Sequence, residues 1–99
     1  MTEIEINYPY STVFDSTINI LRDNDFEIKD SNKDDKFIIA TKDVSLLSYG
    51  ETIEISFRTT NNTTLVSIHS FSKGLQIIDW GTNDKNEKLI YNELKKFRA

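Results

Sequence analysis

The stretch that decides the fold is residues 75–97, LQIIDWGTNDKNEKLIYNELKKF, which also contains the only tryptophan of the chain. Its first part is apolar and extended, whereas its second part repeats apolar residues at the spacing of an α-helix. The apolar stripe of that helix consists of Leu89, Ile90, Leu94 and Phe97. Acidic residues lie near the helix start and lysines near its end, where each complements the helix dipole. The stretch therefore predicts an extended segment that turns sharply into a helix over residues 83–97.

Four residues form the predicted corner between these two parts: Asp79, Trp80, Gly81 and Asn83. The Asp79 carboxylate is placed to accept backbone N–H groups of the turn, and Gly81 adopts a positive φ angle at no steric cost. Thr82 or Asn83 is the expected N-cap of the helix. The alternative is a pocket that binds an anion at the helix N-terminus. Because Asp79 would repel an anion there, we favour a structural role for the corner.

The first part of the chain predicts a strand, a helix and a second strand. Apolar and polar residues alternate over residues 2–8, which is typical of a half-buried strand. A wide apolar face at helical spacing predicts a helix over residues 11–23. Ser11 is its expected N-cap and Asn24 its expected end. A weaker alternation then predicts a strand over residues 26–31.

The middle of the chain predicts three more strands, over residues 36–42, 51–59 and 63–71, with an extension of the last to residue 79 left open. The first of them carries apolar residues on both faces, so it is expected to lie centrally in the sheet or to have one face on the helices and the other on a loop. Asn61 and Asn62 separate the other two and predict a tight hairpin turn, since asparagine tolerates a positive φ angle.

Together these elements predict a single α+β domain over residues 1–99. It is a two-layer sandwich: an antiparallel sheet of about five strands carries two helices on one face, in the order β-α-β-β-β-β-α. The expected core consists of Ile6, Phe14, Leu21, Ile39, Ile55, Val66, Ile68, Leu94 and Phe97.

Composition narrows the classes of function. The chain has no cysteine, which excludes disulfides, thiolate metal sites and cysteine nucleophiles. Its net charge of −4 argues against non-specific binding to nucleic acids or to anionic membranes. Neither a signal peptide nor a membrane span is expected from the sequence. These features favour a cytoplasmic protein.

Two further features point to a binding surface and not to a catalytic centre. The connection over residues 42–51 is long for a hairpin and carries apolar residues, as functional loops often do. The predicted interaction surface consists of Leu46, Leu47, Tyr49 and Phe71. In the alternative interpretation, Leu46 or Leu47 folds back to cap the core. No residue pattern predicts a catalytic, metal-binding or cofactor-binding site.

Three classes of function remain open. We favour a non-enzymatic binding or protein-interaction module that acts through the open sheet face, a sheet edge or the loop at 42–51. The alternative is a carrier or sensor of an apolar small molecule held between the sheet and the C-terminal helix. An enzyme would depend on His69, Ser72 and Asp79, although His69 and Ser72 are expected on opposite sheet faces. The protein is expected to be a monomer or a homodimer paired through strand edges.

Short motifs along the chain resemble those of small bacterial domains of unknown function. Ser70-x-Ser72, followed by Asp79-x-Gly81-x-Asn83 and a terminal helix, is similar to the C-terminal half of these domains. Tyr10-Ser11-x-Val13-Phe14 and Asp25-Phe26-x-Ile28 resemble their opening, with Asp25 in place of the usual glycine. The spacing from Ser-x-Ser to Asp79 is longer than in some members. The resemblance implies the same order of elements and says little about chemistry.

Overall fold

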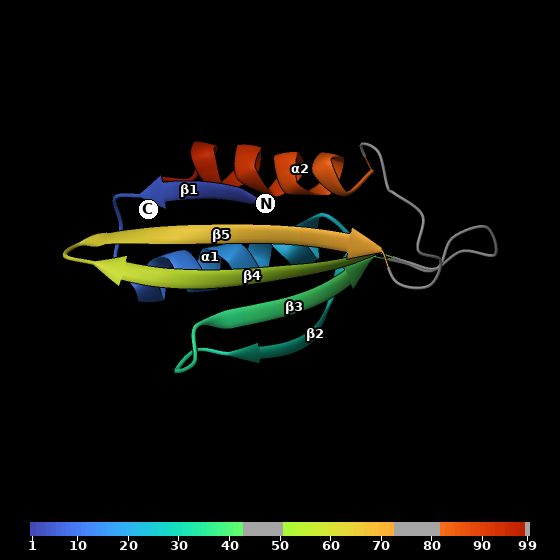
Figure 1. Ribbon diagram of the computed structural model, residues 1–99. Coiled ribbons are helices and arrows are strands. Elements are labelled where there is room, and N and C mark those ends of the chain that lie inside the picture. Colours follow the sequence, from blue (N-terminus) through green and yellow to red (C-terminus); the bar gives the residue numbers. More distant parts are fainter. Residues whose placement is uncertain (43–50, 73–81, 99) are drawn as a thin grey trace.

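A computed structural model describes residues 1–42, 51–72 and 82–98 (Figure 1). It confirms the α+β class and the predicted order of elements. The elements are β1 (Thr2–Ile6), α1 (Tyr10–Asp23), β2 (Phe26–Asn32), β3 (Phe37–Lys42), β4 (Glu51–Thr60), β5 (Thr63–Ser72) and α2 (Thr82–Lys96). Neither of the two described helices is long and apolar enough to cross a membrane.

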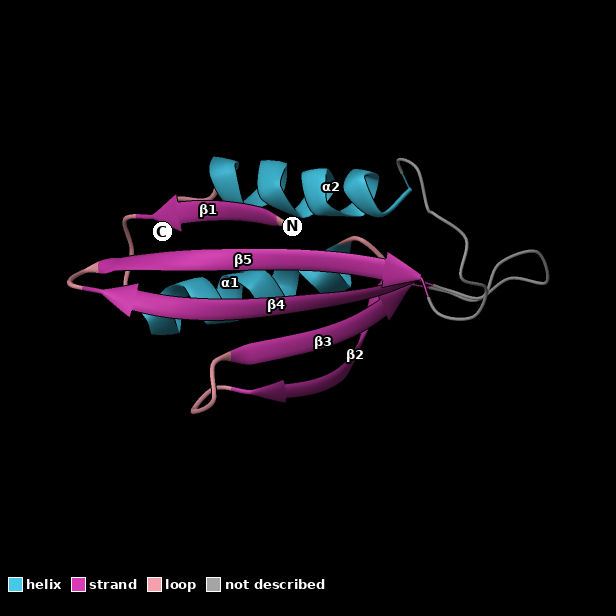
Figure 2. Cartoon of the chain, viewed as in Figure 1, coloured by secondary structure: helices cyan, strands magenta, loops and turns pink. Residues whose placement is uncertain are grey.

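The five strands form one antiparallel sheet in the order β1-β5-β4-β3-β2 (Figure 2). Strands β2 to β5 form a meander in which each strand pairs with the next along the chain. The N-terminal strand β1 adds to β5 at one side, so β1 and β2 are the two edges. Helix α1 packs against β2, β4 and β5, while α2 packs against β1 and β5 and contacts α1. The helices therefore cover one face of the sheet and leave the other face open.

The buried face of the sheet is set by strand register. Ile38 lies opposite Ile55, which in turn lies opposite Ile68, and all three side chains are fully buried. The prediction that Ile39 belongs to the core is wrong, because Ile39 is half-buried on the open face of the sheet. The alternation within residues 37–40 cannot choose between the two faces, and only the pairing with β4 selects Ile38.

The rest of the predicted core is confirmed apart from Phe97. This residue follows the end of α2 and is half-buried, with its ring packed edge-to-face on Tyr8 at 5.3 Å between centroids. The buried members of the prediction are Ile6, Phe14, Leu21, Ile55, Val66, Ile68 and Leu94.

The start of α1 differs from the prediction. Pro9, and not Ser11, is the N-cap residue, and no side chain caps the helix. The Pro9 carbonyl accepts the first helical hydrogen bond from the Val13 N–H at 3.1 Å. The helix therefore begins at Tyr10, whose ring packs on Phe14 and Phe57. Strand β1 accordingly ends at Ile6, before the residue 8 that the alternation predicts.

The predicted ends of two other elements are confirmed. Asn24 terminates α1, and Asp25 after it has a φ angle of 67°. Asn61 has a φ angle of 54° in the turn between β4 and β5. Both residues adopt the left-handed conformation that helix ends and tight turns need.

Candidate functional site

The two edges of the sheet differ in regularity. The pairing of β2 with β3 shifts register between Ile28 and Asp30, which is a β-bulge. Bulges interrupt the row of backbone groups along an edge and oppose the addition of another strand. Strand β1 pairs with β5 without interruption from Thr2 to Ile6. The regular edge of the sheet is therefore β1.

A groove of about 380 Å³ lies between β1 and the C-terminal part of α2. Its walls are Ile4, Glu5, Ile6, Asn7 and Tyr8 from the strand side and Leu94, Lys95, Phe97 and Arg98 from the helix side. Successive side chains of a strand point to opposite faces. Five consecutive residues can border one groove because they share a backbone edge. The groove therefore follows the chain over residues 4–8, of which residues 4–6 belong to β1. We call it the β1 groove.

The floor of the β1 groove is apolar. Ile6 and Leu94 are buried, and Ile4, Tyr8 and Phe97 are half-buried. The Arg98 guanidinium folds back over the helix end and donates hydrogen bonds to the carbonyls of Lys95 (3.2 Å) and Phe97 (2.7 Å). These bonds occupy carbonyls that the end of a helix otherwise leaves without partners.

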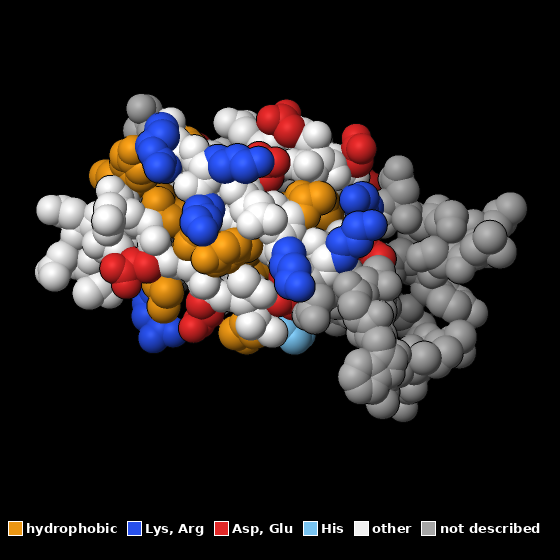
Figure 3. Space-filling view, turned by 90° about the horizontal axis from the view of Figure 1, so that it is seen from above, with side chains coloured by type: hydrophobic (Ala, Val, Ile, Leu, Met, Phe, Trp, Pro, Cys, Tyr) orange, Lys and Arg blue, Asp and Glu red, His pale blue; other side chains and the backbone are white. Residues whose placement is uncertain are grey.

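Charge is divided between the two sides of the groove. The strand contributes the exposed carboxylate of Glu5, and the helix contributes Lys95 and Arg98. Residues 85–98 contain five basic and two acidic side chains, a net charge of +3 in a chain of net charge −4. Figure 3 shows Lys and Arg side chains spread along the face that is seen from above, with apolar side chains between them. Helix α2 as a whole has four basic and three acidic residues, so the basic character is concentrated at its C-terminal end and in Arg98.

The other end of α2 is anchored by Glu87. This side chain is only 3% exposed. Its carboxylate accepts hydrogen bonds from Thr2 Oγ1 at 2.6 Å and from the Ser70 N–H at 2.9 Å, and the Met1 ammonium lies at 3.5 Å. Burial raises the pKa of Glu87, but these hydrogen bonds and the ammonium outweigh burial, so the pKa lies below its ordinary value. Glu87 thus ties α2 to both β1 and β5 as an ionised carboxylate.

The neighbouring residue strengthens this anchor. Asn86 is 4% exposed, and its side-chain amide donates a hydrogen bond to the Glu51 carboxylate at the start of β4. Two adjacent polar residues of α2 are therefore turned towards the sheet. They fix the position of the helix beside β1, and with it the width of the β1 groove.

The sequence analysis expected acidic residues near the helix start to complement the helix dipole, and it did not identify the buried contacts of Glu87. A signal was present: residues 87, 90 and 94 have the spacing of one helix face, so Glu87 extends the Ile90 and Leu94 stripe by a turn. An acidic residue in an apolar stripe needs hydrogen-bond donors from the surface that it faces. Its donors lie in β1 and β5, far away in the sequence.

Most predicted site residues lie outside the described part of the chain. This holds for Leu46, Leu47 and Tyr49 of the predicted surface and for Asp79, Trp80 and Gly81 of the predicted corner. The backbone of Phe71 lies in β5 opposite Thr52, and Asn83 lies in the first turn of α2. Nothing in the structure tests these predictions, and they stay predictions.

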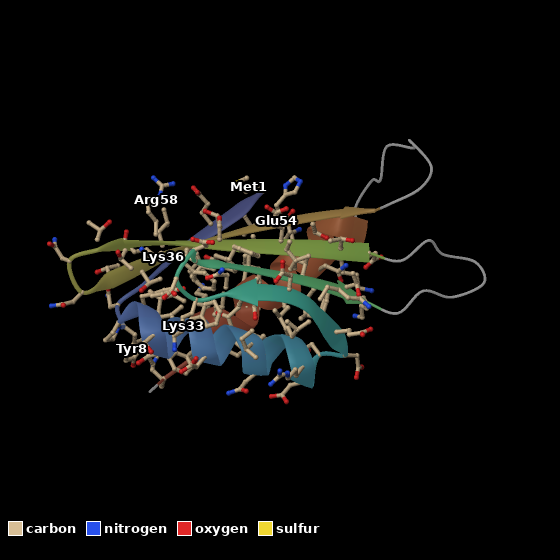
Figure 4. All side chains as sticks on the ribbon, turned by 90° about the horizontal axis from the view of Figure 1, so that it is seen from below. Met1, Tyr8, Lys33, Lys36, Glu54 and Arg58 are labelled. Carbon is tan, nitrogen blue, oxygen red and sulfur yellow. The ribbon has the colours of Figure 1, made fainter. Side chains whose placement is uncertain are left out.

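Of the three residues considered for an enzyme, only His69 has a side chain that the structure describes. His69 is exposed and lies opposite Glu54, on the open face of the sheet. In Figure 4, Glu54 and Arg58 point away from the helices, whereas Tyr8 and Lys33 lie on the helix side. Within residues 1–42, 51–72 and 82–98, no three His, Asp or Glu side chains form a group that could hold a metal ion.

No family model matches the sequence, and no curated protein sequence is significantly similar to it. The geometry of the fold and of the β1 groove is therefore the ground for a functional proposal.

Proposed function

We propose that the protein is a non-enzymatic interaction module that binds an extended segment of a partner protein in the β1 groove. The segment adds to β1 as a sixth strand of the sheet. The observation that carries the proposal is the regular edge of β1, which borders a groove with an apolar floor from Ile4 to Ile6. Strand addition of this kind draws affinity from main-chain hydrogen bonds and specificity from alternate side chains.

The dimensions of the groove suit such a segment. A volume of about 380 Å³ is near the lower end of ligand pockets and accommodates a few side chains. Every second side chain of an added strand would point towards α2 and contact Ile4, Ile6 and Phe97. The remaining side chains would lie on the open face of the sheet.

The alternative function, a carrier of an apolar small molecule, receives less support. Residues from both layers, among them Leu21, Ile38, Ile53 and Ile90, have no exposed surface. No space large enough for a water molecule therefore adjoins them. A small apolar ligand would therefore not lie in the interior between these residues. We also propose a cytoplasmic location, because a chain without cysteine suits a reducing compartment.

The proposal is tested by selecting binders from a random peptide library and mapping them on the protein by amide NMR. We expect selected peptides to shift the amide signals of residues 4–8 and of the C-terminal turn of α2. Ile4→Lys places a charge in the groove floor and should abolish this binding. Ile39→Lys is the matched control, since Ile39 is also half-buried but lies on the open face of β3. Selected peptides that bind both variants equally, or that shift other residues, would refute the proposal.

A further inference from the structure

The side chains on the two faces of β1 indicate the chemistry of the segment, an inference that rests on the proposed function. A strand added to β1 continues the sheet, so its side chains alternate between the helix side and the open face. On the helix side they would neighbour Ile4 and Ile6. On the open face they would neighbour Glu3 and Glu5, the exposed residues of β1. Each face of the added strand therefore meets a different chemistry.

The two glutamates present uncompensated charge at the sheet edge. Neither takes part in an ion pair within the described part of the chain. Glu3 accepts a hydrogen bond from Ser67 Oγ at 2.9 Å, which orients its carboxylate without neutralising it. In the register, Glu5 lies opposite Leu65 of β5, and Arg58 lies beyond Leu65 on β4. The nearest cation in this cross-strand row, Arg58, is thus two strands away from Glu5.

A second copy of the chain does not fit this edge. Residues directly opposite each other in an antiparallel pair share one face of the sheet. Two antiparallel β1 strands that overlap over most of Thr2–Ile6, with their open faces on the same side, therefore place Glu3 or Glu5 opposite Glu3 or Glu5. Like charges in such positions destabilise the pair. The edge discriminates against self-pairing and favours a strand that carries the opposite charge.

The opposite wall restricts where the positive charges of that strand can lie. Lys95 is exposed on the helix side of the groove, with Arg98 close to the helix end. A Lys or Arg that pointed towards α2 would meet these cations and the apolar floor. We infer that the β1 groove binds a segment in which apolar residues face α2 and alternate with Lys or Arg residues that face Glu3 and Glu5.

The test compares synthetic peptides of equal length in which Val alternates with Lys, with Ser or with Glu. Binding is measured by fluorescence anisotropy and located by amide NMR. Two favourable cross-strand charge pairs should make the Val/Lys peptide bind about five-fold more tightly than the Val/Ser peptide. The Val/Glu peptide should bind more weakly than either. A peptide with the composition of Val/Lys but with its valines and lysines in separate blocks controls for general attraction to an acidic protein.

A pair of charge-reversal variants locates the effect. Glu5→Lys should weaken Val/Lys binding about tenfold and raise the affinity for Val/Glu. Glu54→Lys changes the net charge equally on the open face of β4, away from the edge, and should leave the preference unchanged. Circular dichroism and thermal melting confirm that both variants fold. Glu5→Gln, which removes the charge with the least change in shape, should remove part of the preference.

The outcomes separate the inference from the proposed function. If Val/Ser binds as tightly as Val/Lys and shifts residues 4–8, the groove binds strands but the inferred charge pattern is wrong. The same conclusion follows if the blocked peptide matches Val/Lys, or if Glu54→Lys weakens binding as much as Glu5→Lys. If none of the peptides shifts residues 4–8, the proposed function fails together with the inference.

Discussion

Glu87 offers the most direct test of how the last helix is held on the sheet. Glu87→Ala removes the acceptor of two hydrogen bonds, from Thr2 Oγ1 and from the Ser70 N–H. A buried N–H left without a partner costs about 1–3 kcal/mol, and a hydrogen bond to a charged group contributes about 1.5–3 kcal/mol. Met1 is largely exposed, so the ion pair made by its ammonium adds little. We expect the variant to lose about 3 kcal/mol of unfolding free energy.

That loss is a large part of the stability of a domain of this size, which is of the order of 5–15 kcal/mol. Urea denaturation followed by circular dichroism measures it at neutral pH. Glu93→Ala is the matched control, because Glu93 lies in the same helix, is half-buried and makes no ion pair within the described residues. Its loss should be within about 0.5 kcal/mol of zero.

A double-mutant cycle with Thr2→Val then isolates one contact. Valine keeps the shape of threonine and removes the hydroxyl donor. A coupling free energy of about 1 kcal/mol or more between positions 2 and 87 is expected, because the hydroxyl is bonded directly to the carboxylate. Equal losses in Glu87→Ala and Glu93→Ala, or no coupling in the cycle, would refute the buried anchor.

Three further predictions follow from the backbone and from ionisation. Because the pKa of Glu87 is lowered on folding, its charge stabilises the protein above the ordinary glutamate pKa of about 4.5. In urea titrations, the excess unfolding free energy of the wild type over Glu87→Gln should therefore shrink as pH falls from about 5 to about 3. Asp25→Gly should raise the unfolding free energy by about 0.5 kcal/mol, because glycine tolerates the φ angle of 67°. Asp23→Gly, at the last position of α1, should lower the unfolding free energy, and a change of the same sign in both variants would contradict this account. Burial, followed by the nearby Asp34 and Asp15 carboxylates, raises the pKa of Tyr10 above its ordinary value of about 10, so the tyrosinate absorbance that Tyr10→Phe removes should appear only above that pH. The stability that the protonated Tyr10 side chain contributes should be lost as pH rises from about 10 through the raised pKa.

The order of the elements was predictable because most segments carry a clear local period. The alternation of β4 and the asparagines of its turn with β5 specify that hairpin without reference to the rest of the chain. Asn24 likewise marks the end of α1, and the structure confirms it. Local agreement between pattern and turn residues is the condition under which a sequence predicts its own elements.

The sequence predictions fail where contacts with a second element determine which residue is buried or where a helix begins. Ile38 and Ile39 are equivalent by composition, and the register with β4 alone chooses between them. Ser11 is a good N-cap by type, but Pro9 and the aromatic contacts of Tyr10 start the helix one residue earlier. The β1 groove has no local signal at all, since its two walls are about ninety residues apart in the sequence.

The position of β1 beside β5 also has a consequence for the folding pathway. Strands β2 to β5 pair with their sequence neighbours, so the meander can form through short loop closures. The pairing of Ile4 with Val66 closes a loop of more than sixty residues, which costs more chain entropy and delays this contact. We therefore expect β1 and α2 to join a preformed meander late, after the main kinetic barrier. Contacts that form after the barrier change the unfolding rate more than the folding rate. The contacts of Glu87 would thus lower the unfolding rate of the native state and have little effect on its folding rate.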